Sequence, residues 1–255
     1  MSPRRRRALS LAIAALALVL PAATSAAAIP SAQRIADAVA IANRAAGRSG
    51  PLWIDVSLRI GEGEPLAQGV LTTHPTGLAR LELRSTRGFV ERHLVQGSEY
   101  GASRDGQLID QPRPFLPPVF VLQAVSGAAL QAALGSFGVA ADRAELGLGD
   151  DHDCYVLGGR AVRGPDGVEP AQPSLWVDME SFEVVRIDRG DGVRFRFGPS
   201  EDFGGVRLPR WISIEAPGQT PARLEILKAT AANAPAASFS TDWLVTPPGP
   251  PPASP

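Results

Sequence analysis

The chain has 255 residues, a formal net charge of −1 at pH 7 and a single cysteine. One cysteine excludes a disulfide within the chain, so stability must come from a packed apolar core, which a chain of this length can build in one domain. A nucleic-acid partner is disfavoured, because no basic cluster follows the first seven residues and such partners are bound through concentrated positive charge.

The first 28 residues have the layout of a secretory signal peptide. Arginines occupy positions 4–7, an apolar run of 13 residues fills 8–20, and a series of small residues ends at Ala28. This run is too short for a membrane-spanning helix, which needs ~20 residues. We expect cleavage after Ala26 or Ala28 and export of a soluble protein at a net charge of −5. No lipid attachment is expected, because no cysteine follows the cleavage region.

Residues 31–46 predict the first helix. Ser31 follows a proline and can cap the helix N-terminus, and Gly47 is well placed to end it. Apolar residues recur with helical spacing at Ile35, Val39, Ala42 and Ala46. This stripe indicates an amphipathic helix with one buried face.

Alternation of apolar and polar residues then predicts a series of β-strands. We expect strands at 52–60, 66–73, 78–85, 88–96 and 98–103, and after the middle of the chain at 154–158, 193–197, 206–215 and 222–229, with residues 174–195 forming two strand–turn–strand units. Turn signals separate them at 105–106, 149–153, 165–167, 179–181, 191–192 and 202–205. Turns this frequent predict that neighbouring strands pair antiparallel.

The middle of the chain, residues 114–138, has helical spacing instead. Pro117 and Pro118 suit a helix start, and Ser126 can cap a second helix that ends at Gly138. We interpret this region as two short helices or one kinked helix.

About ten strands and few helices predict an α+β protein that is mainly antiparallel β. A sheet of that size tends to curl, and the helices must cover one of its faces. The folded domain is expected to span 29–245, because the proline-rich residues 246–255 predict a disordered tail. An apolar space between the curled sheet and its helices would suit an apolar ligand.

Residues able to carry out chemistry are few. The run Asp150-Asp151-His152-Asp153-Cys154 contains metal-ligand types, but consecutive side chains cannot all converge on one ion, so we interpret it as a polar turn. The sequence has three histidines and no G-x-S-x-G, H-E-x-x-H or Walker motif. We therefore expect no enzyme activity, no catalytic residues, no metal and no cofactor.

Four single residues leave two interpretations open. Cys154 is expected to be a small buried residue of a strand, and the alternative is a reactive thiol. Trp53, Trp176 and Trp211 fall on the polar positions of their strands. They either pack against another layer or form a rim for a ligand or a partner.

Four segments carry a resemblance to a known family. Residues 174–188, SLWVDMESFEVVRID, form a hairpin pattern of tryptophan, acid, turn and return strand. Residues 202–215, DFGGVRLPRWISIE, give a turn and an alternating strand, and 97–109 and 223–239 add a further hairpin and a last strand. Together they resemble the periplasmic outer-membrane lipoprotein carriers and their relatives, which share the LolA/LolB-like fold.

This resemblance implies an open, curled half-barrel in the periplasm, with helices covering the concave face and a hydrophobic cavity for acyl chains. The ligand would be an acylated lipoprotein or lipid, and the partners would be an inner-membrane transporter and an outer-membrane receptor of a monomeric carrier. The arginine that locks the lid in this family has no counterpart that we can assign. The alternative is a periplasmic sensor or interaction module of the same fold that binds an inner-membrane regulator.

We expect the cavity to be lined by the apolar positions of the strands and of the middle helices. These residues are Leu81, Leu83, Leu122, Leu130, Leu134, Phe137, Val193, Phe195, Phe197, Ile212, Ile214, Leu224 and Ile226. If strands and helices met fully, the residues would form an ordinary core. A carrier instead leaves room that an acyl chain can fill, at about 0.8 kcal/mol per buried methylene.

Overall fold

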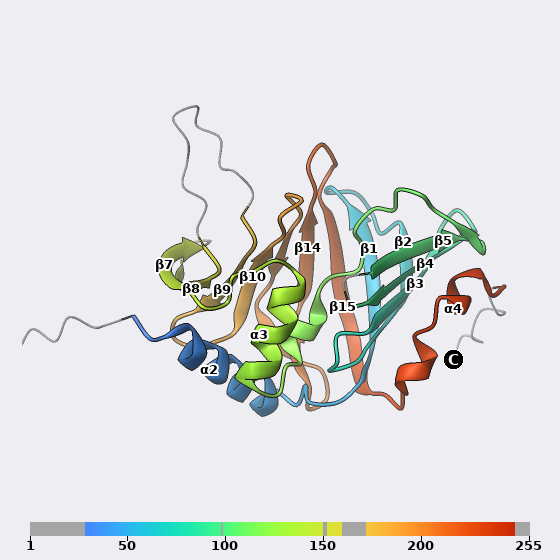
Figure 1. Ribbon diagram of the computed structural model, residues 1–255. Helices are drawn as coiled ribbons and strands as arrows, with labels where there is room; N and C mark the ends of the chain where they lie inside the picture. Colours follow the sequence, from blue (N-terminus) through green and yellow to red (C-terminus); the bar gives the residue numbers. More distant parts are fainter. Residues whose placement is uncertain (1–28, 98, 150–151, 160–171, 248–255) are drawn as a thin grey trace, which may run out of the picture.

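The computed structural model describes residues 29–97, 99–149, 152–159 and 172–247 (Figure 1). The predicted signal peptide, the predicted turn at 165–167 and nearly all of the predicted tail lie outside these ranges. None of the helices in the described ranges is long and apolar enough to cross a membrane.

Most of the described chain is β-strand. The first half supplies β1 (Leu52–Ile60), β2 (Ala67–Thr73), β3 (Ala79–Ser85), β4 (Val90–Gln96), β5 (Glu99–Arg104) and β6 (Gln107–Leu108). The second half supplies β7 (Ala144–Gly149), β8 (His152–Leu157), β9 (Ser174–Asp178), β10 (Val184–Asp188), β11 (Arg194–Phe197), β12 (Ser200–Asp202), β13 (Arg207–Pro209), β14 (Trp211–Glu215) and β15 (Ala222–Ala231).

Within the described residues, thirteen strands form one open antiparallel sheet in the order β6-β5-β4-β3-β2-β1-β15-β14-β11-β10-β9-β8-β7. Within each half of the chain, strands that follow one another in this sheet also lie side by side in it. The pairing of β1 with β15 joins the two halves and places Leu58 opposite Leu224. The sheet curls around the helices (Figure 1). The predicted α+β class with an open, curled antiparallel sheet is confirmed.

Helices cover the inner face of the sheet, as predicted. They are α2 (Ala32–Ala45), the short 3-10 helix η1 (Val119–Leu122) and α3 (Gly127–Ser136) (Figure 1). Both predicted caps are present: the Oγ atoms of Ser31 and Ser126 accept hydrogen bonds from the backbone N–H groups of Arg34 and Ala129 at 3.3 and 3.2 Å. The region 114–138 therefore holds two short helices, the first of which begins directly after Pro118.

Alternating residues of the strands form the core between sheet and helices. In β1 the alternating apolar residues Leu52, Ile54, Val56 and Leu58 are buried, and the last of the series, Ile60, is partly buried. They join residues of α2, η1, α3 and the other strands in one large apolar cluster. The predicted one-sided burial of the strands is therefore confirmed for this side of the sheet.

The outer face of β3, β4 and β5 is covered by the C-terminal segment 232–246, which contains the short helices η2 (Ala236–Ser238) and α4 (Asp242–Val245). Leu94 of β4 packs with Phe239 and Leu244 in a second apolar cluster. Arg92 donates a 2.8 Å hydrogen bond to the carbonyl oxygen of Trp243 and stacks on its ring. The domain thus has apolar packing on both faces of one half of the sheet.

Two details of the predicted strands were wrong. The expected ten strands are fifteen in the described residues, because short strands such as β6 and β12 hold too few residues to show an alternation. The predicted strand 206–215 is also two strands that belong to different sheets. The chain bends at Arg210, whose backbone N–H bonds to Pro199 while its carbonyl accepts from Ile226.

Candidate ligand-binding site

Residues 109–118, here called the strap, run in extended form over the inner face between β6 and η1 (Figure 1). Arg113 fixes the strap to the turn between β14 and β15, donating 2.8 Å hydrogen bonds to the side chain of Gln219 and the carbonyl oxygen of Thr220. On the other side, the hydroxyl of Tyr100 donates to the carbonyl oxygen of Arg113 at 2.7 Å. The strap therefore bridges the two halves of the curled sheet.

The first part of the strap covers a cavity of about 300 Å³, here called the upper cavity. Its other walls come from the ends of β1 and β2 and from the turn between β3 and β4. Its apolar lining consists of Leu58, Ile60, Leu66, Ala67, Leu83, Phe89, Ile109, Pro112 and Phe115. Arg104 and Glu91, which form an ion pair of 3.0 Å, add charge to one wall.

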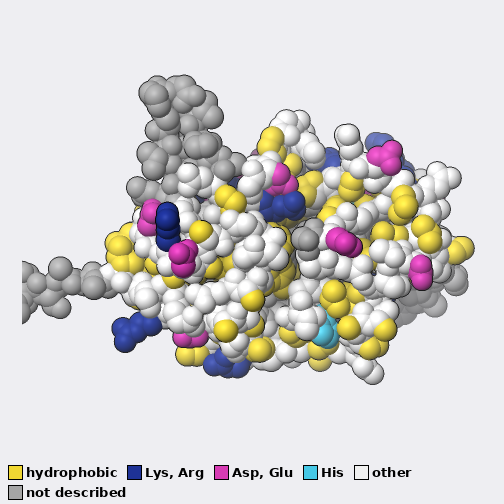
Figure 2. All heavy atoms as spheres, in the orientation of Figure 1, with side chains coloured by type: hydrophobic (Ala, Val, Ile, Leu, Met, Phe, Trp, Pro, Cys, Tyr) yellow, Lys and Arg dark blue, Asp and Glu magenta, His cyan; other side chains and the backbone are white. Residues whose placement is uncertain are grey.

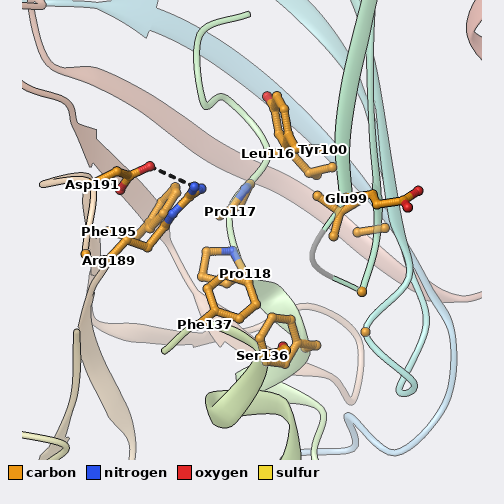
Figure 3. A pocket seen from close by; sticks show the side chains of 16 residues that line it. Glu99, Tyr100, Leu116, Pro117, Pro118, Ser136, Phe137, Arg189, Asp191 and Phe195 are labelled. Atoms are coloured by element: carbon orange, nitrogen blue, oxygen red, sulfur yellow. Dashed lines mark ion pairs between the residues drawn. The ribbon is translucent and has the colours of Figure 1, made fainter. Parts of the chain in front are cut away.

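The second part of the strap covers a further cavity of about 210 Å³, here called the lower cavity. Figure 3 shows Leu116, Pro117 and Pro118 between Tyr100 on one side and Phe195 on the other. Phe137, at the end of α3, closes the lower side of the cavity, and the ion pair of Arg189 and Asp191 stands at its rim at 2.8 Å. On the outside of the molecule, Figure 2 shows hydrophobic side chains scattered over the visible face.

A buried polar cluster lies beneath the strap. His93 is fully buried, its Nε2 lies 3.0 Å from Glu91, and its Nδ1 lies 2.8 Å from the hydroxyl oxygen of Tyr100. The hydroxyl of Tyr100 therefore contacts both the buried imidazole and the backbone of the strap. Phe115 of the strap packs edge-on against the imidazole at a ring distance of 5.5 Å.

The surroundings shift the pKa values of Tyr100 and Glu91 in opposite directions. Burial raises the pKa of the Tyr100 hydroxyl far above its ordinary value, so the phenol stays protonated. Burial also acts to raise the pKa of Glu91, but hydrogen bonds and charges from His93 and Arg104 outweigh it, and the net pKa is lowered. Glu91 is therefore a carboxylate near neutral pH, and it holds Arg104 beside the upper cavity.

The structure brings the thirteen predicted cavity residues into one apolar cluster on the inner face. Twelve of them are buried and Phe137 is partly buried. Phe137 and Phe195 line the lower cavity and Leu83 lines the upper cavity, whereas Leu81, Leu130 and Leu134 are fully enclosed in the core. Most of these residues pack against one another, and two of them, Leu122 and Phe197, line a separate cleft away from the strap. Whether they bind a ligand stays a prediction.

Sequence reasoning missed the strap itself. Its residues were assigned to a helical region or left without a role, although prolines at 112, 114, 117 and 118 argue for extended chain. Arg113, which holds the strap in place, has no sequence signal of its own, because its partners Gln219 and Thr220 lie 106 and 107 residues away.

Cys154 and the polar residues directly before it were also candidates for a functional role. Cys154 is fully buried in β8, in a small outer-face cluster with Val156 and Trp176, as expected of a small buried residue. The predicted polar turn is shorter than expected, because His152 and Asp153 already belong to β8; Asp150 and Asp151 lie outside the described residues. Among the described residues, no cluster of His, Cys, Asp or Glu could hold a metal ion.

The three tryptophans lie on the outer face and differ in exposure. Trp53 is 50% exposed, whereas Trp176 is 5% exposed and packs over glycines of β7. Trp211 lies directly over Gly198, where a Cβ atom would come within 2.4 Å of the indole. Arg186 and Arg223 stack on Trp176 and Trp211 at 4.4 Å from each ring. Trp176 and Trp211 therefore pack over glycines of their own sheet and over the glycine that follows β11, which differs from the expected packing against another layer.

Comparison with solved structures identifies the fold. A LolA superfamily protein from Nitrosomonas europaea is 15% identical with a TM-score of 0.51, over 84% of this chain and 100% of that chain. A DUF1329 family protein from Desulfovibrio piger is 14% identical with a TM-score of 0.47, over the same shares. A domain described as an outer membrane lipoprotein-sorting protein, from Vibrio parahaemolyticus, is 10% identical with a TM-score of 0.40, again over 84% and 100%.

The chain therefore has a LolA-like fold, an assignment that rests on the Nitrosomonas structure and on the open, curled sheet with helices on its inner face. A scan against models of protein families found no match, and a search of curated proteins found none. The fold resemblance predicted from the four sequence segments is confirmed.

Proposed function

We propose that the protein is a periplasmic carrier that binds the acyl chain of a lipoprotein or lipid on the inner face of its sheet. The observation that carries this proposal is the pair of cavities with mainly apolar linings that successive parts of one strap cover. Small-molecule sites usually occupy ~300–1,000 Å³, so each cavity alone is at or below the lower end of that range. Displacement of the strap joins them into a space that suits a long, narrow apolar chain.

Binding in this way is driven by burial of methylene groups, each of which contributes about 0.8 kcal/mol, against the cost of association and of moving the strap. No catalytic step is part of the proposal. The export-signal pattern of residues 1–28 supports a periplasmic location. The expected observation is a mature protein in the osmotic-shock fraction whose N-terminus lies between Ala27 and Ser31.

Two adjacent residues provide a matched test of the binding site. Ile109 lines the upper cavity, whereas Leu108 is 64% exposed and lies outside it. Ile109→Asp replaces an apolar wall of the cavity with a charged group that an acyl chain would have to desolvate, so we expect it to weaken binding of a fluorescent fatty acid by at least about tenfold. Leu108→Asp should bind like the wild type. Equal effects of both substitutions, or no binding by the folded wild type, would refute the carrier proposal.

The alternative, an interaction module for an inner-membrane regulator, is an outcome of a second experiment. Purification of the protein from a periplasmic extract, followed by mass spectrometry, should recover acylated proteins or lipids if the carrier proposal is right. Recovery of a membrane regulator without acylated ligands would favour the alternative.

A further inference from the structure

Arg48 departs from the usual packing of a buried arginine. Its side chain is 2% exposed, and within the described part of the chain neither Nε nor Nη2 has a hydrogen-bond partner. Buried polar groups in folded proteins nearly always have partners, and a buried guanidinium is especially costly without them. Arg48 is therefore a candidate to bind a ligand through these two nitrogen atoms.

The end of α2 is built to hold Arg48 in place. Gly47 adopts φ +74°, and a Cβ atom there would lie 2.5 Å from the carbonyl oxygen of Gly205 in the turn between β12 and β13. The backbone N–H of Arg207 donates to the carbonyl oxygen of Ala46 at 2.9 Å. The close approach requires glycine at position 47 and fixes Arg48 against this hairpin.

Glu183 is the acid nearest to Arg48, and both of its oxygens are already in use. Oε1 accepts from Arg207 at 3.0 Å, and Oε2 accepts from Ser200 at 2.7 Å. Nη2 of Arg48 remains 3.7 Å from Oε1, which is too far for a hydrogen bond. Two guanidinium groups therefore share the one carboxylate of Glu183.

The charge of Arg48 persists despite its burial. Burial lowers the pKa of the guanidinium, Glu183 acts in the opposite direction, and the resulting pKa is about 10. Arg48 is thus a cation at neutral pH, with an attraction for anions that its burial in a medium of low dielectric strengthens.

A cleft of about 530 Å³ opens beside these residues. It lies between the end of α2, the turn between β9 and β10 and the connection from β11 to β12, and its lining includes Arg48, Glu183, Ser200 and Arg207. The cleft also holds Asp178, whose carboxylate accepts hydrogen bonds from its own turn. It shares no lining residue with the upper or the lower cavity.

We propose that Arg48, together with Arg207, binds an oxyanion, a phosphate or carboxylate group, at this end of the cleft. A guanidinium offers two parallel N–H donors to such a group, and the edge formed by Nε and Nη2 is the one that lacks acceptors. This edge is shielded from solvent, so the anion reaches it by a shift of the arginine side chain toward the cleft. The proposal does not depend on acyl-chain binding beside the strap.

Thermal unfolding in inorganic phosphate, at constant ionic strength with chloride as the balancing anion, tests this site. Phosphate should raise the Tm of the wild type, and Arg48→Met should need at least about tenfold more phosphate for the same shift, as expected for loss of a charge-assisted hydrogen bond. Arg34→Met, which removes an exposed arginine of α2, should respond like the wild type. An unchanged phosphate response in folded Arg48→Met would overturn the proposal.

Two further measurements keep the test decisive. If Arg48→Met fails to fold, the NMR signal of the Arg48 Nε–H group in the wild type should shift as phosphate is added, and a static signal would overturn the proposal. Vesicles of phosphatidylglycerol, compared with phosphatidylcholine, identify the source of the anion. Binding of the anionic vesicles that needs Arg48 indicates a lipid headgroup, a response to phosphate alone indicates a free anion, and no response to either refutes the site.

Discussion

Nη2 of Arg113 donates a 2.8 Å hydrogen bond to the carbonyl oxygen of Thr220, 107 residues further along the chain. The bond ties the strap to the turn between β14 and β15, on the half of the sheet opposite Tyr100. It lies at an exposed place, where water competes for the same groups, so it can open at modest cost. Arg113 therefore holds the first part of the strap by a contact that is specific in geometry and weak in energy, whereas Phe115 and Leu116 are buried in the apolar core.

Replacing Arg113 by alanine should make the strap easier to displace. Because the lost hydrogen bonds are exposed, we expect the free energy of unfolding to fall by only about 1 kcal/mol, while a fluorescent fatty acid binds faster than to the wild type. Stopped-flow fluorescence measures the rate, and urea unfolding measures the stability. Arg87→Ala, at an exposed arginine on the rim of the same cavity, is the control. Equal binding rates for both variants and the wild type would contradict a latch at Arg113.

Glu91 gives a prediction on acid stability. Its pKa is lowered in the folded protein relative to the ordinary value of 4.5, so its contribution to stability is present above pH 4.5 and is lost as the pH falls through the lowered pKa. Glu91→Gln should therefore be less stable than the wild type at pH 7, by about 1–3 kcal/mol, and the difference should shrink below pH 4.5. Urea unfolding from pH 7 to pH 3 measures this. A difference that stays constant over that range would show that the carboxylate charge has no part in the effect.

Gly198 should resist substitution because of the indole above it. A Cβ atom at position 198 would meet the ring of Trp211 at 2.4 Å, so Gly198→Ala must displace the tryptophan and should cost about 1–3 kcal/mol. Gly135, in α3, has no atom within 4 Å of its Cβ position, and Gly135→Ala should stabilise the protein by about 0.5–1 kcal/mol. Urea unfolding of both variants tests the pair. Similar stabilities for the two would show that Trp211 moves away freely.

Cys154 should behave as a packing residue. The thiol is fully buried beside Val156 and Trp176, so it should react with a thiol reagent only after the protein unfolds. Cys154→Ala should keep ligand binding and lose at most a few kcal/mol of stability. Labelling with and without urea, combined with the fatty-acid assay, measures both properties. Loss of binding by a folded Cys154→Ala variant would assign the thiol a functional role instead.

The predictions from sequence succeeded where the physical cause is local. Alternation in residues 52–60 depends only on which face of one strand is buried, and β1 occupies the same residues. Ser31 and Ser126 cap their helices through backbone groups three residues away, so the signal and its effect lie in one short segment.

Features that depend on distant partners could not be predicted in this way. Arg48 looks like an ordinary residue after a helix, and its burial follows only from the position of the β12–β13 hairpin. Trp176 and Trp211 stand at polar strand positions because they pack over glycines of neighbouring or nearby strands, and the sequence does not say which strands are neighbours. The cavities follow from the strap, which Arg113 anchors to residues more than 100 positions further along the chain.

The pairing of β1 with β15 also sets the order in which the molecule can assemble. Each half of the sheet can form from neighbouring segments, but the ion pair between Arg59 and Glu225 across the central seam spans 166 residues. Closing so long a loop slows folding, because the conformational entropy of the loop is lost before the contacts between β1 and β15 stabilise the fold. Until then the molecule carries two unpaired strand edges at what will become its centre. A chain of this topology cannot close its central seam until almost all of it has been synthesised.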